Sequence, residues 1–126
     1  MEGLSSPELD EIAEDQGVVL PAAYRGFLEV AGRACGRLWV GTDAFYPVLL
    51  GVKQDAIELM EEFHAPFSLA ATDVVIGMNQ GYEFLYLSGP GDDPPVSGWH
   101  ESHGSRGVIF DSFTHLVEAE LRELSA

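Results

Sequence analysis

The sequence predicts an α+β fold with an antiparallel-rich mixed sheet, an N-terminal helical hairpin, a middle helix and a C-terminal helix. Apolar residues recur at helical spacing near both ends and in the middle of the chain, whereas short apolar runs bounded by turn residues fill much of the remainder. Helices and strands do not alternate strictly, as a parallel sheet would require. Because 126 residues with 46% hydrophobic content suffice for one core, we expect a single domain over residues 1–126.

Two helices are predicted at the N-terminus. Ser6-Pro7-Glu8 combines a capping serine, a proline and an acidic residue, which favour a helix start, and Gly17 is suited to end that helix. Pro21 then opens a second helix, which Gly32 ends. Only the short apolar segment Val18–Leu20 separates the two helices, so we expect them to form an αα-hairpin.

The middle of the chain predicts two strands and a third helix. The strands are expected at Arg37–Val40 and Phe45–Leu50, with Gly41–Asp43 as the turn between them. The helix is expected from about Val52 to His64, because apolar residues fall on one stripe of it and acidic residues on the opposite side. The apolar stripe comprises Val52, Ala56, Leu59, Met60 and Phe63, and the acidic side comprises Asp55, Glu58, Glu61 and Glu62.

The C-terminal half predicts further short strands and a last helix. Strands are expected at Val74–Met78, Tyr82–Leu87, Val96–His100 and Gly107–Phe110, with a tight turn at Gln80-Gly81 and loops at Gly89–Pro95 and Ser102–Arg106. Asp111 or Ser112 is expected to cap the last helix. Its apolar face comprises Phe113, Leu116, Val117, Leu121 and Leu124. Glu120 projects toward that face, and we expect it at the edge of the packing because an unpaired buried carboxylate is costly.

The charge balance is strongly acidic. The formal net charge is −15, and Lys53 is the single lysine. Such a field repels nucleic acid and anionic membranes, so neither is an expected partner, and it attracts a basic protein. The alternative is that the charge serves solubility alone. A single cysteine, Cys35, excludes an internal disulfide and fits a cytoplasmic location. We also expect neither a signal peptide nor a membrane span, because the required apolar runs are absent from the sequence.

Residues with catalytic or metal-binding potential are few. His100 and His103 can share a metal if their segment forms a turn, but a third ligand is not evident and an extended strand would direct them to opposite faces. The alternative is an exposed polar strand end. Cys35 lies near Arg33 and Arg37, which favour a reactive thiolate, but without a nearby histidine a structural thiol is the expected role. We therefore expect no enzyme, and no catalytic, cofactor-binding or metal-binding residues.

The acidic side of the third helix is the main candidate for contact with a protein. The alternative for these acids, as for those of the first helix, is a face that is simply solvated. Aromatic residues often anchor interfaces, and Trp99 is the one that we most expect to be partly exposed. The expected partner-binding residues are Asp55, Glu58, Glu61, Glu62, Glu83, Asp92, Asp93, Trp99 and Glu101.

Four sequence segments occur in an order that resembles a known family. An acidic first helix, Glu8–Ile12, leads to Leu20-Pro21-x-x-Tyr24-Arg25-x-Phe27-Leu28. Asn79-Gln80-Gly81-Tyr82-Glu83-Phe84, Gly91-Asp92-Asp93-Pro94-Pro95-Val96 and Asp111-Ser112-Phe113-x-x-x-Val117 follow. This set, over about residues 8–124, resembles the SUKH superfamily, whose founding eukaryotic members include the yeast cell-wall assembly regulator. The segment Gly32–Gly36 departs from the pattern, because many members have a shorter Asn-Gly-Gly turn there.

The resemblance implies a binding function and supplies no catalytic residue. Bacterial members are mostly immunity proteins of polymorphic toxin systems, which neutralise a cognate toxin domain, often a nuclease. A negative surface can imitate the phosphates that such a nuclease binds. We therefore expect an immunity protein with a basic toxin domain as its partner. Two alternatives stay open: a regulatory scaffold module that recruits endogenous proteins, as eukaryotic members do, and a small metal-dependent enzyme that uses His100 and His103.

Overall fold

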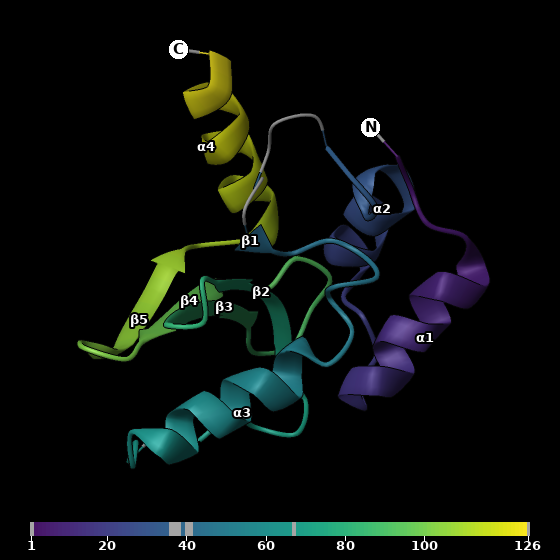
Figure 1. The fold of residues 1–126 in the computed structure, drawn as a ribbon. Helices are drawn as coiled ribbons and strands as arrows, with labels where there is room; N and C mark the ends of the chain where they lie inside the picture. The colour runs from purple at the N-terminus through teal and green to yellow at the C-terminus, as the bar shows by residue number, and fades with distance from the viewer. Residues whose placement is uncertain (1, 36–38, 40–41, 67, 126) are drawn as a thin grey trace.

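The predicted α+β class is confirmed. The computed structural model describes residues 2–35, 39, 42–66 and 68–125, and within them helices surround a five-stranded sheet of order β1-β2-β3-β4-β5 (Figure 1). Every pairing of these strands is antiparallel. The elements are α1 Ser6–Gln16, α2 Ala22–Ala31, β1 Thr42–Asp43, α3 Val52–Glu62, β2 Val74–Asn79, β3 Glu83–Leu87, β4 Val96–His100, β5 Gly104–Phe110 and α4 Phe113–Ser125.

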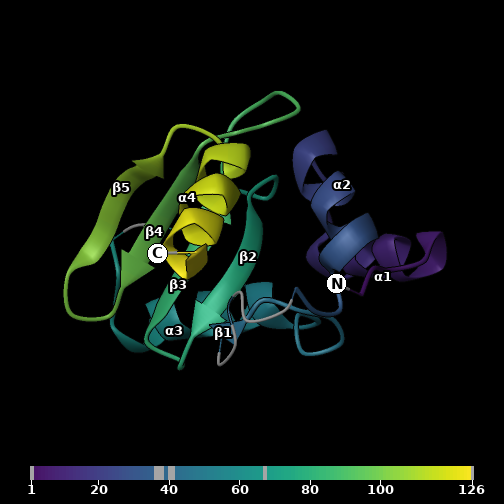
Figure 2. The same cartoon turned by 90° about the horizontal axis from the view of Figure 1, so that it is seen from above.

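The sheet lies between two helices. α4 covers one face and α3 the other, while α1 and α2 stand beside the β2 side of the sheet (Figures 1 and 2). The alternation of side chains along β3 fits this arrangement, because Phe84 and Tyr86 are buried on the α3 side. On the other face, Phe113 and Leu116 of α4 are buried in the same core cluster as Leu87. Both faces of the sheet are thus used for packing.

The two N-terminal helices begin and end close to the predicted residues. Ser5 and Glu8 form a capping box at the start of α1, in which Ser5 Oγ accepts a hydrogen bond from the Glu8 N–H. Gly17 ends α1 with a φ of 69°, a conformation that glycine adopts without strain. The α2 helix follows Pro21 and ends before Gly32, as predicted.

A buried glutamine joins α1 to the edge of the sheet. β1 pairs with only the last two residues of β2, so the edge of β2 around Val75 has no strand beside it in the described chain. The Gln16 side chain takes that place: its Nε2 donates to the Val75 carbonyl at 2.8 Å, and its Oε1 accepts from the Val75 N–H at 2.9 Å. An amide side chain therefore substitutes for a neighbouring strand.

Lys53 joins α1, α3 and the segment before β2. Its Nζ donates to the carbonyl oxygens of Gln16 at 3.2 Å, Ala71 at 2.9 Å and Asp73 at 2.7 Å. Three acceptors match the three N–H groups of an ammonium, so this buried side chain has all its hydrogen-bonding capacity used. Desolvation lowers the pKa of Lys53, and the nearby Asp73 acts in the opposite direction.

The segment between α2 and α3 differs from the prediction. Phe45–Leu50 is a series of turns instead of a strand, because Leu49 N–H donates to the Phe45 carbonyl and Leu50 N–H to that of Pro47. Thr42 and Asp43, predicted as part of a turn, form strand β1. Of the other predicted strand, Arg37–Val40, only Trp39 lies within the described residues, and it is in a turn.

The connection between β2 and β3 agrees with the prediction, whereas the connection between β4 and β5 differs from it in part. Gln80 and Gly81 have φ values of 51° and 79°, as a tight turn with a mirror-image backbone requires, so the predicted turn between β2 and β3 is confirmed. The predicted loop Ser102–Arg106 is wrong at its C-terminal end, because β5 already begins at Gly104, which pairs with His100. Gly107, which pairs with Gly98, has a positive φ at the register shift between Gly98 and Trp99.

Replacing Gln16 by alanine tests the link between α1 and the sheet. We expect Gln16→Ala to lower the free energy of unfolding by about 2–3 kcal/mol, because the Val75 N–H and carbonyl are left buried without partners. Gln54→Ala, which removes an exposed glutamine from α3, should change it by less than about 0.5 kcal/mol. Urea unfolding followed by circular dichroism measures both, and equal losses would contradict the assignment.

Candidate functional site

An acidic recess lies between α3 and the β1 edge of the sheet. Asp55, Glu58 and Glu62, which succeed one another along α3, line it together with Asp43 of β1, and all four are exposed. Leu59, Met78 and Gly81 complete the lining of a shallow depression of about 280 Å³. Asp43 is a residue that sequence reasoning missed, because the segment was expected to be a turn, and only the pairing of β1 with β2 brings it here.

The carboxylates of the acidic recess take part in none of the ion pairs found among the described residues. Arg25 lies 3.8 Å from both Asp10 and Glu29, Arg33 pairs with Glu8, and Arg106 pairs with Glu83. Lys53 is on α3, but its ammonium group points to the buried carbonyl groups on the opposite side of that helix. The charge of the recess is therefore left for solvent or for a partner.

The other predicted contact residues are spread over the molecule. Glu61 lines a different depression with His64, and Glu101 is half-buried in the turn between β4 and β5. Asp92 and Asp93 are exposed in the loop between β3 and β4. That loop is tied to two helices, because the Ala23 N–H donates to the Asp92 carbonyl and the Thr114 N–H donates to Asp93 Oδ1. The loop thus holds the start of α2 close to the start of α4.

The expectation that Trp99 is partly exposed is wrong. Only 3% of Trp99 is accessible, because its ring is stacked on Phe84, with ring centres 5.8 Å apart, beneath Phe63 at the end of α3. The sequence showed charged neighbours, but alternation along β4 directs this side chain to the α3 face. Trp39 is instead the half-exposed tryptophan, and it packs against Phe27 and Phe45.

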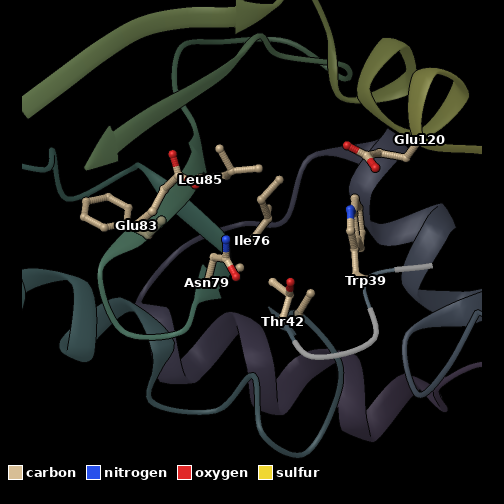
Figure 3. A pocket seen from close by; sticks show the side chains of 10 residues that line it. Trp39, Thr42, Ile76, Asn79, Glu83, Leu85 and Glu120 are labelled. Atoms are coloured by element: carbon tan, nitrogen blue, oxygen red, sulfur yellow. The ribbon is translucent and has the colours of Figure 1, made fainter. Parts of the chain in front are cut away.

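A second recess, the Trp39 pocket, lies on the opposite face of the same sheet edge. It has a volume of about 220 Å³, and Figure 3 shows its main side chains. They are Trp39, Thr42, Ile76, Asn79, Glu83, Leu85 and Glu120. In this view the Glu120 carboxylate lies directly above the Trp39 indole, and Glu83 and Asn79 lie on the far side of Ile76. α4 thus forms one wall of the pocket and the sheet forms the floor.

Strand alternation explains why the two recesses share an edge. Thr42 is paired with Asn79, and both line the Trp39 pocket. The next pair, Asp43 and Met78, lines the acidic recess. Because successive residues of a strand point to opposite faces, two neighbouring rungs of one ladder supply both sites. A single partner that covers this edge can reach both recesses.

Glu120 projects toward the apolar face of α4, and it lies at the edge of the packing as expected. Partial burial raises its pKa, and the negative charge of Glu123 raises it further. Glu83, on the opposite side of the pocket, differs from Glu120 in having a counter-charge, because it forms an ion pair with Arg106. Beyond this wall, Leu124 remains 37% exposed, so the predicted apolar face of α4 is only partly covered.

The histidine pair comes together in the structure. Residues 101–103 form a turn, in which the His103 N–H donates to the His100 carbonyl, and the two rings are 4.8 Å apart. The condition set for a shared metal is thus met for two ligands. In the described parts of the chain, however, no three His, Cys, Asp or Glu side chains are grouped so that they could hold a metal ion.

Two further expectations concern Cys35 and the membrane. Cys35 is half-buried. None of the described helices is long and apolar enough to cross a membrane.

A comparison with protein families decides the relationship that the four segments suggested. The model of the SMI1 / KNR4 family (SUKH-1) matches residues 3–119. The chain belongs to this family. No curated protein matches the chain significantly. The SUKH-1 match includes all of α1–α3, the whole sheet and the first half of α4, and Glu120 is the first residue after it. Both recesses therefore belong almost entirely to the SUKH-1 region.

Replacing Glu120 by glutamine tests its partly desolvated position. The raised pKa means that folding disfavours the ionised carboxylate, so this group weakens the fold above its folded-state pKa and has no such effect below about pH 4, where it is protonated in both states. We expect Glu120→Gln to raise the melting temperature at pH 7, with the gain disappearing toward pH 4. Glu118→Gln, an exposed change of equal charge on the same helix, is the control. Equal melting temperatures of the two variants at pH 7 would contradict the prediction.

Proposed function

We propose that this protein is a non-catalytic binding domain of the immunity type. It neutralises a basic toxin domain by binding the cationic surface of that domain through the acidic recess. The observation that carries the proposal is the group of four acidic side chains, Asp43, Asp55, Glu58 and Glu62, that no described cation neutralises. Membership of the SUKH-1 family supports a binding role for the domain.

Electrostatics favours a basic partner over other classes. With a net charge of −15, the chain attracts cationic proteins over distances of about one Debye length, about 8–10 Å, and repels nucleic acid. Concentrating carboxylates in one recess also gives the attraction a direction. A toxin that binds nucleic acid has a cationic surface, and this recess offers that surface an alternative set of negative oxygens.

The position of the recess also suits a rigid contact surface. Asp55, Glu58 and Glu62 project from a helix whose buried side is held in the core by Ala56 and Met60. Asp43 is held by its rung with Met78. Because the backbone that carries these side chains is fixed by packing, little backbone ordering is needed when a partner binds.

Charge reversal on α3 tests the proposal. The partner for this test is a basic toxin domain encoded by a neighbouring gene. Unrelated basic proteins serve as the control for specificity. We expect Glu58→Lys/Glu62→Lys to slow association about tenfold or more at low salt and to abolish protection against the toxin. The melting temperature should stay unchanged, since both side chains are exposed. Stopped-flow association and thermal unfolding measure the two quantities.

The matched control changes charge equally at exposed sites elsewhere. Glu14→Lys/Glu118→Lys alters two exposed acids on α1 and α4, and should slow association no more than about threefold, through the long-range field alone. Equal slowing by both double variants would place the contact outside the recess. Several moderate-affinity endogenous partners, with no toxin gene nearby, would favour the regulatory scaffold instead.

A further inference from the structure

The Trp39 pocket contains a carboxylate without a counter-charge. Glu120 takes part in none of the ion pairs among the described residues, and Glu123, whose charge helps to raise the pKa of Glu120, is also negative. Glu83, by contrast, is neutralised by Arg106. The pocket is thus electrostatically one-sided: a free negative group at the α4 wall and a compensated one at the far end.

The remaining lining suits the body of an organic cation. Trp39 is seen nearly edge-on in Figure 3, with one ring face turned toward Ile76 and Thr42. An aromatic face attracts an ammonium or guanidinium group, and the side chains of Ile76 and Leu85 accept an alkyl chain. A volume of about 220 Å³ exceeds that of several water molecules, at about 30 Å³ each, so a short chain with its head group fits.

We propose that the Trp39 pocket binds one alkylammonium or guanidinium group against the face of the Trp39 ring and within reach of the Glu120 carboxylate. An anion would meet the uncompensated negative charge of Glu120 and is repelled. A neutral occupant would remove more water from Glu120 without replacing its lost hydration. A cation does replace it, and thereby removes the destabilisation that partial burial of Glu120 causes in the free protein.

The source of this group is the one point that rests on the proposed function. Because neighbouring rungs of the β1–β2 ladder line both recesses, a basic protein that covers the acidic recess lies next to the Trp39 pocket. A lysine or arginine side chain of that protein is therefore the occupant that we assign. A free small amine has the same chemistry, and the experiment separates the two sources.

Nuclear magnetic resonance of the two indole N–H groups tests the binding of the cation itself. Trp39 lines the pocket, and Trp99 is buried on the other face of the sheet and serves as an internal reference. n-Butylammonium chloride and methylguanidinium chloride are titrated against potassium chloride of equal ionic strength and against neutral n-butanol. We expect a saturable shift of the Trp39 signal in the millimolar range with the two organic cations only, and an unchanged Trp99 signal.

Two variants identify the carboxylate. Glu120→Gln should weaken binding of both cations about tenfold, the loss expected for one partly desolvated ion pair, whereas Glu118→Gln should leave it within about twofold. Absence of a saturable Trp39 shift in the wild-type protein, or equal affinities of the two variants, would overturn the proposal while leaving the acidic recess unaffected.

The toxin complex distinguishes the two sources of the cation. If the occupant comes from the partner, the complex no longer binds n-butylammonium, and Glu120→Gln accelerates dissociation of the toxin while Glu118→Gln does not. If n-butylammonium still binds to the complex with unchanged affinity, the assignment to a partner side chain is wrong and the pocket takes a free amine. Failure of Glu58→Lys/Glu62→Lys to affect the toxin would instead count against the proposed function, without bearing on the titration of the free protein.

Discussion

The arrangement of this molecule depends on two buried polar side chains that meet where α1, α3 and β2 converge. Gln16 completes the hydrogen bonding of Val75 at the uncovered edge of β2, and Lys53 binds the carbonyl of Gln16 together with those of Ala71 and Asp73. Each would be costly if it were left unpaired. The Gln16 side chain is satisfied only when α1 lies against β2, and Lys53 only when α1, α3 and the segment before β2 are all in place. These contacts therefore specify the relative placement of helices that apolar packing alone would leave less sharply defined.

The same contacts determine which side of α3 faces outward. Because Lys53 is anchored inside, the acidic residues on the opposite side of the helix are directed toward solvent beside β1. β1 has only two residues, yet it gives one rung to each face of the sheet. A very short strand at an edge is a common way to limit unwanted pairing between sheets. Here it also becomes the boundary between an acidic surface and a partly apolar pocket.

Local sequence patterns were sufficient for the elements that are stabilised locally. The four helices, the turn at Gln80-Gly81 and the strands β2 to β4 follow from periodicity, capping residues and glycine positions. β1 was missed because a two-residue strand exists only through its pairing with residues far along the chain. The burial of Trp99 was missed for a related reason, since its neighbours in sequence are polar while its neighbours in space are Phe63 and Phe84. Glu120, which broke a local pattern, was predicted correctly at the rim of the packing.

The sequestration of Lys53 has a chemical consequence. An amine reacts with acylating reagents through its lone pair, and the ammonium of Lys53 has no lone pair while it donates all three protons to carbonyl oxygens. The side chain is also only 8% accessible. Acylation of the single lysine in this chain thus requires an opening that frees its Nζ from the carbonyl groups of Gln16, Ala71 and Asp73. The rate of that modification therefore reports how often the contact between α1, α3 and the segment before β2 opens.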